Sequence, residues 1–177
     1  PDAISALKVL FENGNADAKL AAAKALLCAA GQVQAEPAAV ILNQILAADM
    51  PDMIRAGAFS SLLQAEPQKA LDRVISAVEG QDELLQLTAI AALATLNAPD
   101  IAKRLSPLLP KLAGNLQALI VTALTERSDA SVLPLLHAVL DSDSEDARLA
   151  AMRAIAVHGN ASSIEPLCAI IEKTELI

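Results

Sequence analysis

One helical segment recurs along the chain at a nearly constant interval. Its copies begin at Lys19, Arg55, Gln86, Gln117 and Arg148, so that successive starts lie 36, 31, 31 and 31 residues apart. A fixed period of this length is typical of repeat proteins, in which each unit buries its apolar face by stacking on its neighbours. The period therefore predicts an array of similar units, with one insertion in the first interval.

The aligned copies keep a characteristic side-chain size at each position. Counted from the start of each copy, position 3 is Ala or Ile, position 6 is Ala or Ser, and position 7 is Leu or Ile. Positions 0, 3, 4 and 7 share one face of an α-helix, so this face is predicted to be buried. The residues expected to be almost fully buried in the middle of the array are Ala89, Ala92, Leu93, Ala123 and Leu124.

A second apolar pattern precedes each copy and predicts another helix in every repeat. It is marked by apolar residues four apart, such as Leu136 and Leu140, and short polar turns such as Gly80-Gln81-Asp82 separate it from the copy that follows. The predicted fold class is all-α, an α-solenoid of antiparallel helix pairs with about five and a half repeats. Helices are expected near residues 2–12, 16–30, 36–48, 51–65, 68–79, 82–96, 98–112, 114–127, 130–140, 144–158 and 161–172.

The organisation predicted from these repeats is a single domain, 1–177, excised from a longer protein. The expected repeats span approximately 1–31, 36–65, 68–96, 98–127, 130–158 and, in part, 161–177. The last repeat lacks its second helix, so its first helix is expected to expose apolar surface and to make an end-to-end contact. The residues concerned are Ile164, Leu167, Ile170 and Ile171.

Composition excludes several classes of function. Hydrophobic residues make up 54% of the chain but aromatic residues only 1%, which favours close packing of helices through Ala, Leu, Ile and Val. The longest uncharged run, Leu84 to Pro99, is shorter than the roughly 20 apolar residues of a membrane span. A net charge of −8 without a basic stripe excludes nucleic acid as the partner. A soluble chain is expected, cytoplasmic by default, with the periplasm and secretion as open alternatives.

The fifth copy carries a pattern known from other proteins. An apolar first helix up to Leu140 is followed by an acidic turn, by the pair Ala147-Arg148, and by a second helix with Ala151 and Ala154. This pattern resembles the HEAT repeats, especially the short bacterial kind also seen in phycobilisome lyases. The resemblance covers essentially the whole chain and implies an armadillo-like superhelix. It implies little about activity, because such repeats serve scaffolds, transport factors, regulators and lyase-chaperones alike.

Catalytic and metal chemistry have no candidate motif in this sequence. His137 and His158 fit helix-packing and helix-end roles, and neither has a cysteine at a spacing suited to zinc. The acidic turn from Asp141 to Asp146 lacks the glycine and the spacing of a calcium loop, so it is interpreted as a helix cap. We therefore expect no enzymatic activity, no cofactor and no metal ion.

The remaining function class is binding. Positions 2, 5 and 9 of each second helix point away from the predicted core and would line a curved, concave face. The candidate binding residues on this face are Lys24, Ser60, Gln64, Thr88, Thr95, Thr122, Glu126 and Arg153. The expected function is a non-catalytic protein-interaction or spacer scaffold, whose partner is another protein or another domain of the same chain. The alternative is an accessory or regulatory domain of a larger enzyme whose catalytic domain lies outside this segment.

Overall fold

The computed structural model describes residues 2–30, 35–127 and 130–175, and these residues form helices, turns and loops with no strand. The outer limits of the first and last expected repeats lie outside the described residues. The chain divides into two compact units, Pro1–Ala89 and Ile90–Ile177, and the boundary falls within helix α6. The fold class all-α is therefore confirmed. In the part of the chain that is described, no helix combines the length and apolarity that crossing a membrane requires.

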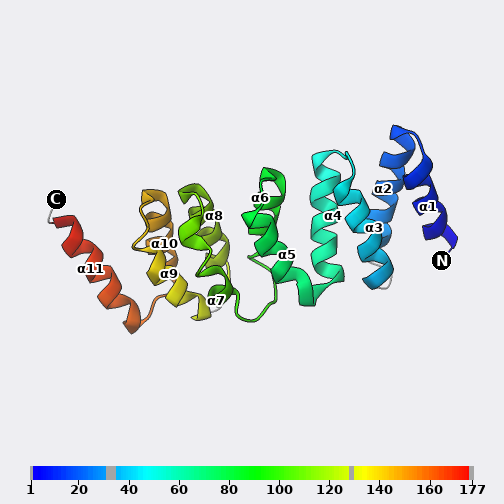
Figure 1. Ribbon diagram of the computed structural model, residues 1–177. Coiled ribbons are helices and arrows are strands. Elements are labelled where there is room, and N and C mark those ends of the chain that lie inside the picture. Colours follow the sequence, from blue (N-terminus) through cyan, green and yellow to red (C-terminus); the bar gives the residue numbers. More distant parts are fainter. Residues whose placement is uncertain (1, 31–34, 128–129, 176–177) are drawn as a thin grey trace. The chain divides into compact units, whose positions relative to one another are not determined.

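The first unit is built from helical hairpins (Figure 1). Helices α1 and α2 pack together, as do α3 and α4, and α2 and α5 both contact α4. The apolar core includes the fully buried side chains of Leu42, Ile45 and Leu62. The helices of this unit are α1 (Asp2–Asn13), α2 (Ala16–Ala30), α3 (Ala35–Ala47), α4 (Asp52–Ala65), α5 (Pro67–Glu79) and the first part of α6 (Glu83–Ala92).

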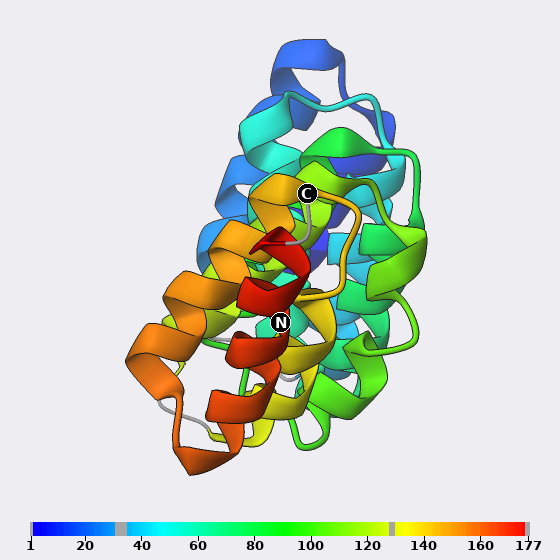
Figure 2. The same cartoon turned by 90° about the vertical axis from the view of Figure 1, so that its left-hand side faces the viewer.

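The second unit repeats this arrangement. Helix α8 packs closely on α10, and α10 also packs on α9. Figure 2 views this unit from the side of its last helix, α11, which is drawn in red. The elements of the unit are α7 (Ile101–Leu105), the 3₁₀ turn η1 (Leu109–Lys111), α8 (Gly114–Thr125), η2 (Ala130–Val132), α9 (Leu133–Val139), α10 (Glu145–His158), η3 (Ala161–Ser163) and α11 (Ile164–Glu175).

The buried face of the second helices follows the repeat. Positions 3 and 7 are buried in all five copies, as the sequence predicts; these residues are Ala22, Ala58, Ala89, Ile120 and Ala151, and Leu26, Leu62, Leu93, Leu124 and Ile155. The prediction is wrong for Ala92 and Ala123, which are only half-buried. Both occupy position 6, which lies more than a quarter turn away from the centre of the buried face.

Three predicted helices are shorter than expected, and one of them, expected at 130–140, is divided into η2 and the seven residues of α9. Helix α6 ends at Ala92 instead of residue 96, and the next residues form tight turns in which, for example, the Thr95 amide donates to the Ala92 carbonyl. The helix expected at 98–112 is reduced to α7 and η1. Pro107 and Pro110 have no amide hydrogen for the α-helical bonding pattern, which explains why α7 cannot continue through this stretch.

The prediction for the last helix holds in part. Ile164 and Ile171 of α11 are 63% and 58% exposed, as expected for a helix without a following mate. Leu167 and Ile170, in contrast, are half-buried. Leu167 borders the exposed side of the helix, since it is three residues after Ile164 and four before Ile171, and Ile170 lies further round. The apolar surface of α11 is therefore partly covered along one edge and open along the other.

Candidate functional site

The eight candidate residues lie on or directly after the second helices. Lys24 is on α2, Ser60 and Gln64 are on α4, and Thr88 is on α6; in the second unit Thr122 is on α8, Arg153 is on α10, and Thr95 and Glu126 follow α6 and α8. All are exposed except Thr88, which is half-buried. The hydroxyls of Thr88 and Thr122 donate to carbonyls of their own helices at 2.7 and 2.8 Å. These two side chains are therefore held close to the helix surface.

The exposure of this face repeats with the sequence. Positions 2, 5 and 9 lie opposite the buried positions on an α-helix. In the five copies none of them is buried, and three are half-buried: Gly57, Thr88 and Ala150. The second helices therefore present a mixed, weakly charged surface to solvent, with small side chains at many positions and the large apolar side chains of Leu119 and Val157 exposed in the second unit. Within each unit, this surface is the one that the sequence predicts.

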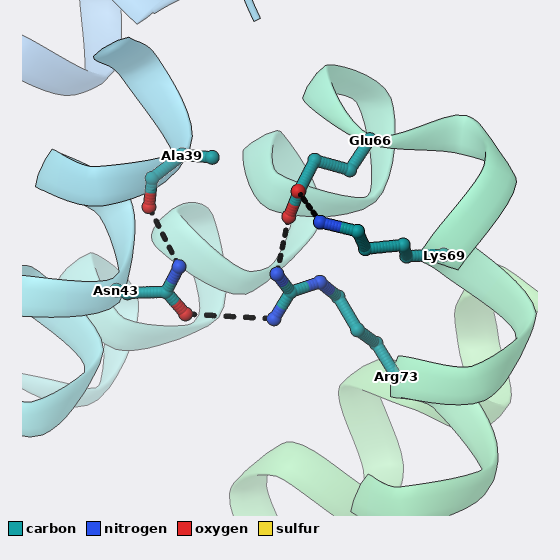
Figure 3. Close-up of polar contacts among 5 residues, drawn as sticks. All are labelled: Ala39, Asn43, Glu66, Lys69 and Arg73. Atoms are coloured by element: carbon teal, nitrogen blue, oxygen red, sulfur yellow. Dashed lines mark hydrogen bonds and ion pairs between the residues drawn. The ribbon is translucent and has the colours of Figure 1, made fainter. Parts of the chain in front are cut away.

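A polar cluster links two successive repeats in the first unit (Figure 3). Arg73 on α5 donates to Glu66, at the start of the same helix, and to Asn43 of α3 at 3.4 Å. The Asn43 amide in turn donates to the Ala39 carbonyl at 2.7 Å. The side chains of Lys69 and Arg73 both donate to Glu66 and thereby lower the pKa of its carboxyl below the ordinary 4.5. Arg73 and Glu66 are half-buried, whereas Asn43 is exposed, so the contact that joins α5 to α3 lies at the surface.

A second link in this unit joins α4 to the start of α6. The Arg55 guanidinium donates to Asp82, whose other carboxylate oxygen accepts the Leu85 amide at 3.2 Å and so caps α6. The hydrogen bond from Arg55, helped by the Leu85 amide, lowers the pKa of Asp82 below the ordinary 3.8. Asp82 therefore connects consecutive repeats and also caps the N-terminal end of α6.

The pKa shift of Glu66 gives a prediction about acid stability. A carboxyl with a lowered pKa in the folded state stabilises the fold above its unfolded pKa, and this contribution disappears as the pH falls through the folded value. Glu66→Gln is thus expected to lower the free energy of unfolding by about 1 kcal/mol at pH 7. The deficit should vanish well below pH 4.5. Urea denaturation at a series of pH values measures it.

Glu79→Gln is the matched control, because Glu79 is an exposed carboxylate on the same helix. It should change stability little at any pH. A deficit of Glu66→Gln that is the same at pH 7 and pH 3 would contradict the role assigned to the carboxylate.

The residue at position 0 of the aligned copies, in the first turn of the second helix, has a shared role in three copies. Gln86 donates to the Gly80 carbonyl at 2.8 Å, Gln117 to the Leu112 carbonyl at 2.9 Å, and Arg148 to the Ser142 carbonyl at 2.7 Å. All three carbonyls lie in the turn after the first helix of the repeat. Glutamine therefore replaces the basic residue of the repeat pattern without loss of this contact.

Polar links also join successive helices in the second unit. The Ser142 hydroxyl donates to Gln117 Oε1 at 2.7 Å, and His158 Nε2 lies 2.7 Å from the Thr125 carbonyl at the end of α8. Arg127 donates to the carbonyls of Leu93 and Leu96 at 2.9 and 2.6 Å. Arg127 and His158 occupy the same repeat position, so both use a side chain at the end of one second helix to satisfy carbonyls at the end of the preceding one.

Two pockets lie elsewhere, beside the turns between first and second helices. The first, of about 630 Å³, is in the second unit, and the other, of about 480 Å³, is in the first unit. Six positions that line the smaller pocket are two repeat periods before six that line the larger one: Arg73, Ser76, Ala77, Gly80, Gln81 and Asp82 precede Leu135, Ala138, Val139, Ser142, Asp143 and Ser144. Both pockets thus occupy the same place in the repeat, and none of the eight candidate residues lines either of them.

Sequence reasoning missed these pockets. The available signal was the glycine in the turns at Gly80 and Gly114, which line the two pockets. The glycines keep side-chain atoms out of these turns, but the space itself depends on the packing of the next repeat, which at Gly114 brings Ser144 to the place that a Cβ would occupy.

Other chemistry-bearing residues are spread out. Among residues 2–30, 35–127 and 130–175, no three His, Cys, Asp or Glu side chains form a group that could hold a metal ion. His137 Nε2 lies 2.9 Å from the Ser163 hydroxyl, and the thiols of Cys28 and Cys168 are free and exposed. Comparisons with protein-family models, with curated proteins and with solved structures found no match to this chain.

Proposed function

We propose that this chain is an α-solenoid of HEAT-like repeats that acts as a non-catalytic protein-interaction scaffold. The observation that carries the proposal is the repeated exposure of positions 2, 5 and 9 on the second helices, opposite positions 3 and 7, which are buried in every copy. A surface that recurs once per repeat suits a partner that extends along several helices.

The links between repeats support the same proposal. A scaffold must keep its binding surface in a fixed shape, since ordering flexible elements on binding costs affinity. Arg55 with Asp82, and Arg73 with Asn43, tie neighbouring helices of the first unit, and His158 with Thr125 does so in the second. Each of these contacts joins helices of successive repeats within one unit.

The chemistry of the face indicates the kind of partner. It is small and smooth, with Gly57, Ala91 and Ala150 among its residues, and charged side chains such as Lys24 and Arg153 are sparse. Small side chains allow the backbone of a helix or an extended segment to approach closely. A protein segment of this kind fits the face better than a small molecule, which needs an enclosed cavity.

Site-specific photo-crosslinking in the native host tests the proposal. A benzophenone side chain is placed at Thr122 or Arg153 on the proposed face, at Ala138 in the larger pocket, or at Lys103 on α7 as an exposed control. We expect Thr122 and Arg153 to capture the same protein and Lys103 to capture none. The captured protein is then purified, and its affinity for the chain is measured by calorimetry.

The substitutions Thr122→Arg and Arg153→Glu each place a charge in the contact to which the partner is not matched. Each should therefore weaken the affinity by about tenfold or more. Lys103→Glu, outside the face, should leave it unchanged. Capture from Ala138 alone would show that the pocket, and not the second-helix face, binds the partner. Absence of capture from all positions would favour a spacer over an interaction scaffold.

A further inference from the structure

The last helix, α11, has an apolar stripe that its counterpart one repeat earlier buries. On α11 the side chains of Ile164, Cys168 and Ile171 follow the spacing i, i+4 and i+7 and therefore share one side of the helix. All three are exposed, with Ile164 at 63% and Ile171 at 58%. The side chains of Glu165 and Glu172, also exposed, flank this stripe.

The same positions in α9 are covered. One repeat period before Ile164 and Ile171 lie Leu133 and Leu140, which are only 4% and 2% exposed. Helix α10 packs along α9, and Ser163 of the next repeat contacts His137, the counterpart of Cys168. Two of the three counterparts are thus buried, and the third, His137, is half-buried beside the start of the next repeat.

We propose that the stripe Ile164–Cys168–Ile171 is a docking site for one further helix of the α10 type, lying antiparallel on α11. Helix α10, which packs on both α8 and α9, is the model for the chemistry of that helix. The residues that α10 buries are Ala147, Ala151, Ala154 and Ile155, three small side chains and one large one. A docking helix needs the same small residues for close approach and a large residue to fill the space beside Cys168.

Charge adds a second requirement for the occupant. Glu165 and Glu172 at the edge of the stripe favour a helix that carries lysine or arginine beside its apolar face, since opposite charges at the rim of a contact guide association. This site is separate from the second-helix face proposed above. Failure of either proposal therefore leaves the other standing.

The test supplies such a helix at high local concentration. A copy of residues 144–158 is appended to the full chain through a flexible linker, which gives an effective concentration in the millimolar range. The readout is the rate at which a thiol reagent labels Cys168, with the exposed thiol of Cys28 as the internal standard. If the appended helix binds the stripe with a dissociation constant of about 0.1 mM, the stripe is free for about one tenth of the time. Labelling of Cys168 should then slow by about tenfold relative to Cys28.

Two variants and one control keep the result specific. An appended helix with glutamate in place of the residues that copy Ala151 and Ile155 should give no protection. Ile171→Lys in α11 should also abolish the protection while circular dichroism shows an unchanged helix content, because Ile171 is exposed. The parent chain without an appended helix should label Cys168 and Cys28 at rates that do not depend on protein concentration.

Equal labelling of Cys168 with and without the appended helix would overturn the proposal. So would protection of Cys168 in the parent chain that grows with concentration and accompanies a dimer mass in light scattering, since the occupant would then be a second copy of this chain.

Discussion

Replacing Leu124 with alanine is expected to lower the free energy of unfolding of its unit by about 2 to 5 kcal/mol. Leu124 is fully buried on α8, the helix that packs most closely on α10. The shortened side chain loses its transfer energy and leaves a cavity, because the surrounding helices are held by their own buried residues and close it only in part. Urea denaturation followed by circular dichroism measures the loss.

Leu119→Ala is the matched control for this substitution. Leu119 is on the same helix, but it is 42% exposed and occupies position 2 of the repeat. Its truncation removes the same atoms from a site that solvent already reaches, so the expected cost is about 0.5 kcal/mol or less. Similar losses for both substitutions would contradict the assignment of buried and exposed repeat positions.

The repeat itself explains why much of the fold could be predicted. Five aligned copies show which positions keep an apolar residue, and helix geometry then assigns positions 3 and 7 to one side and 2, 5 and 9 to the other. Leu93 and Leu124 are buried as this reasoning requires. Ala92 and Ala123 are only half-buried. A recurring small residue at position 6 does not by itself indicate burial, because a residue at the edge of the face is covered only where a neighbour reaches it.

Helix ends were less predictable. The periodicity of apolar residues continues through 98–112, but α7 covers only Ile101–Leu105, because Pro107 and Pro110 cannot donate the required hydrogen bonds. The apolar pattern alone thus predicts a longer helix than the backbone chemistry of the two prolines allows. Helix α6 likewise loses its last turn, and the carbonyls of Leu93 and Leu96 are taken by Arg127 from the following repeat.

The polar contacts and pockets required the packed structure. Nothing in the sequence around Arg73 pairs it with Asn43, since the two residues lie on different helices and meet only when successive repeats stack. The same holds for His158, whose expected role at the end of its own helix is in fact a contact with the Thr125 carbonyl of α8. The exposure of the candidate face followed from periodicity alone, whereas binding there stays a prediction.

A tight contact between two turns gives the second stability prediction. Gly114, the first residue of α8, lies against Ser144, and a Cβ added at this glycine would lie closer than 3.0 Å to both the Cβ and the Oγ of Ser144. Ser144 caps α10 by accepting the Ala147 amide at 3.3 Å, and its own amide donates to Ser142 at 3.1 Å. Because Ser144 Cβ cannot rotate away, Gly114→Ala must shift the cap and is expected to cost about 1 to 3 kcal/mol.

Gly57→Ala should have the opposite sign. Gly57 lies inside α4, and an added Cβ would meet only Leu27 Cδ1 at 3.4 Å, an ordinary contact. Alanine in a helix interior is more stable than glycine by about 0.5 to 1 kcal/mol, so this variant should be more stable than the parent chain.

Urea midpoints of both variants and of the double substitution Gly114→Ala with Ser144→Gly give the comparison. The double substitution removes both the clash and the cap of α10. It should therefore be more stable than Gly114→Ala, but less stable than the parent chain by the roughly 1 kcal/mol that the missing cap costs. A stabilising effect of Gly114→Ala itself would mean that the two turns are not in contact in solution.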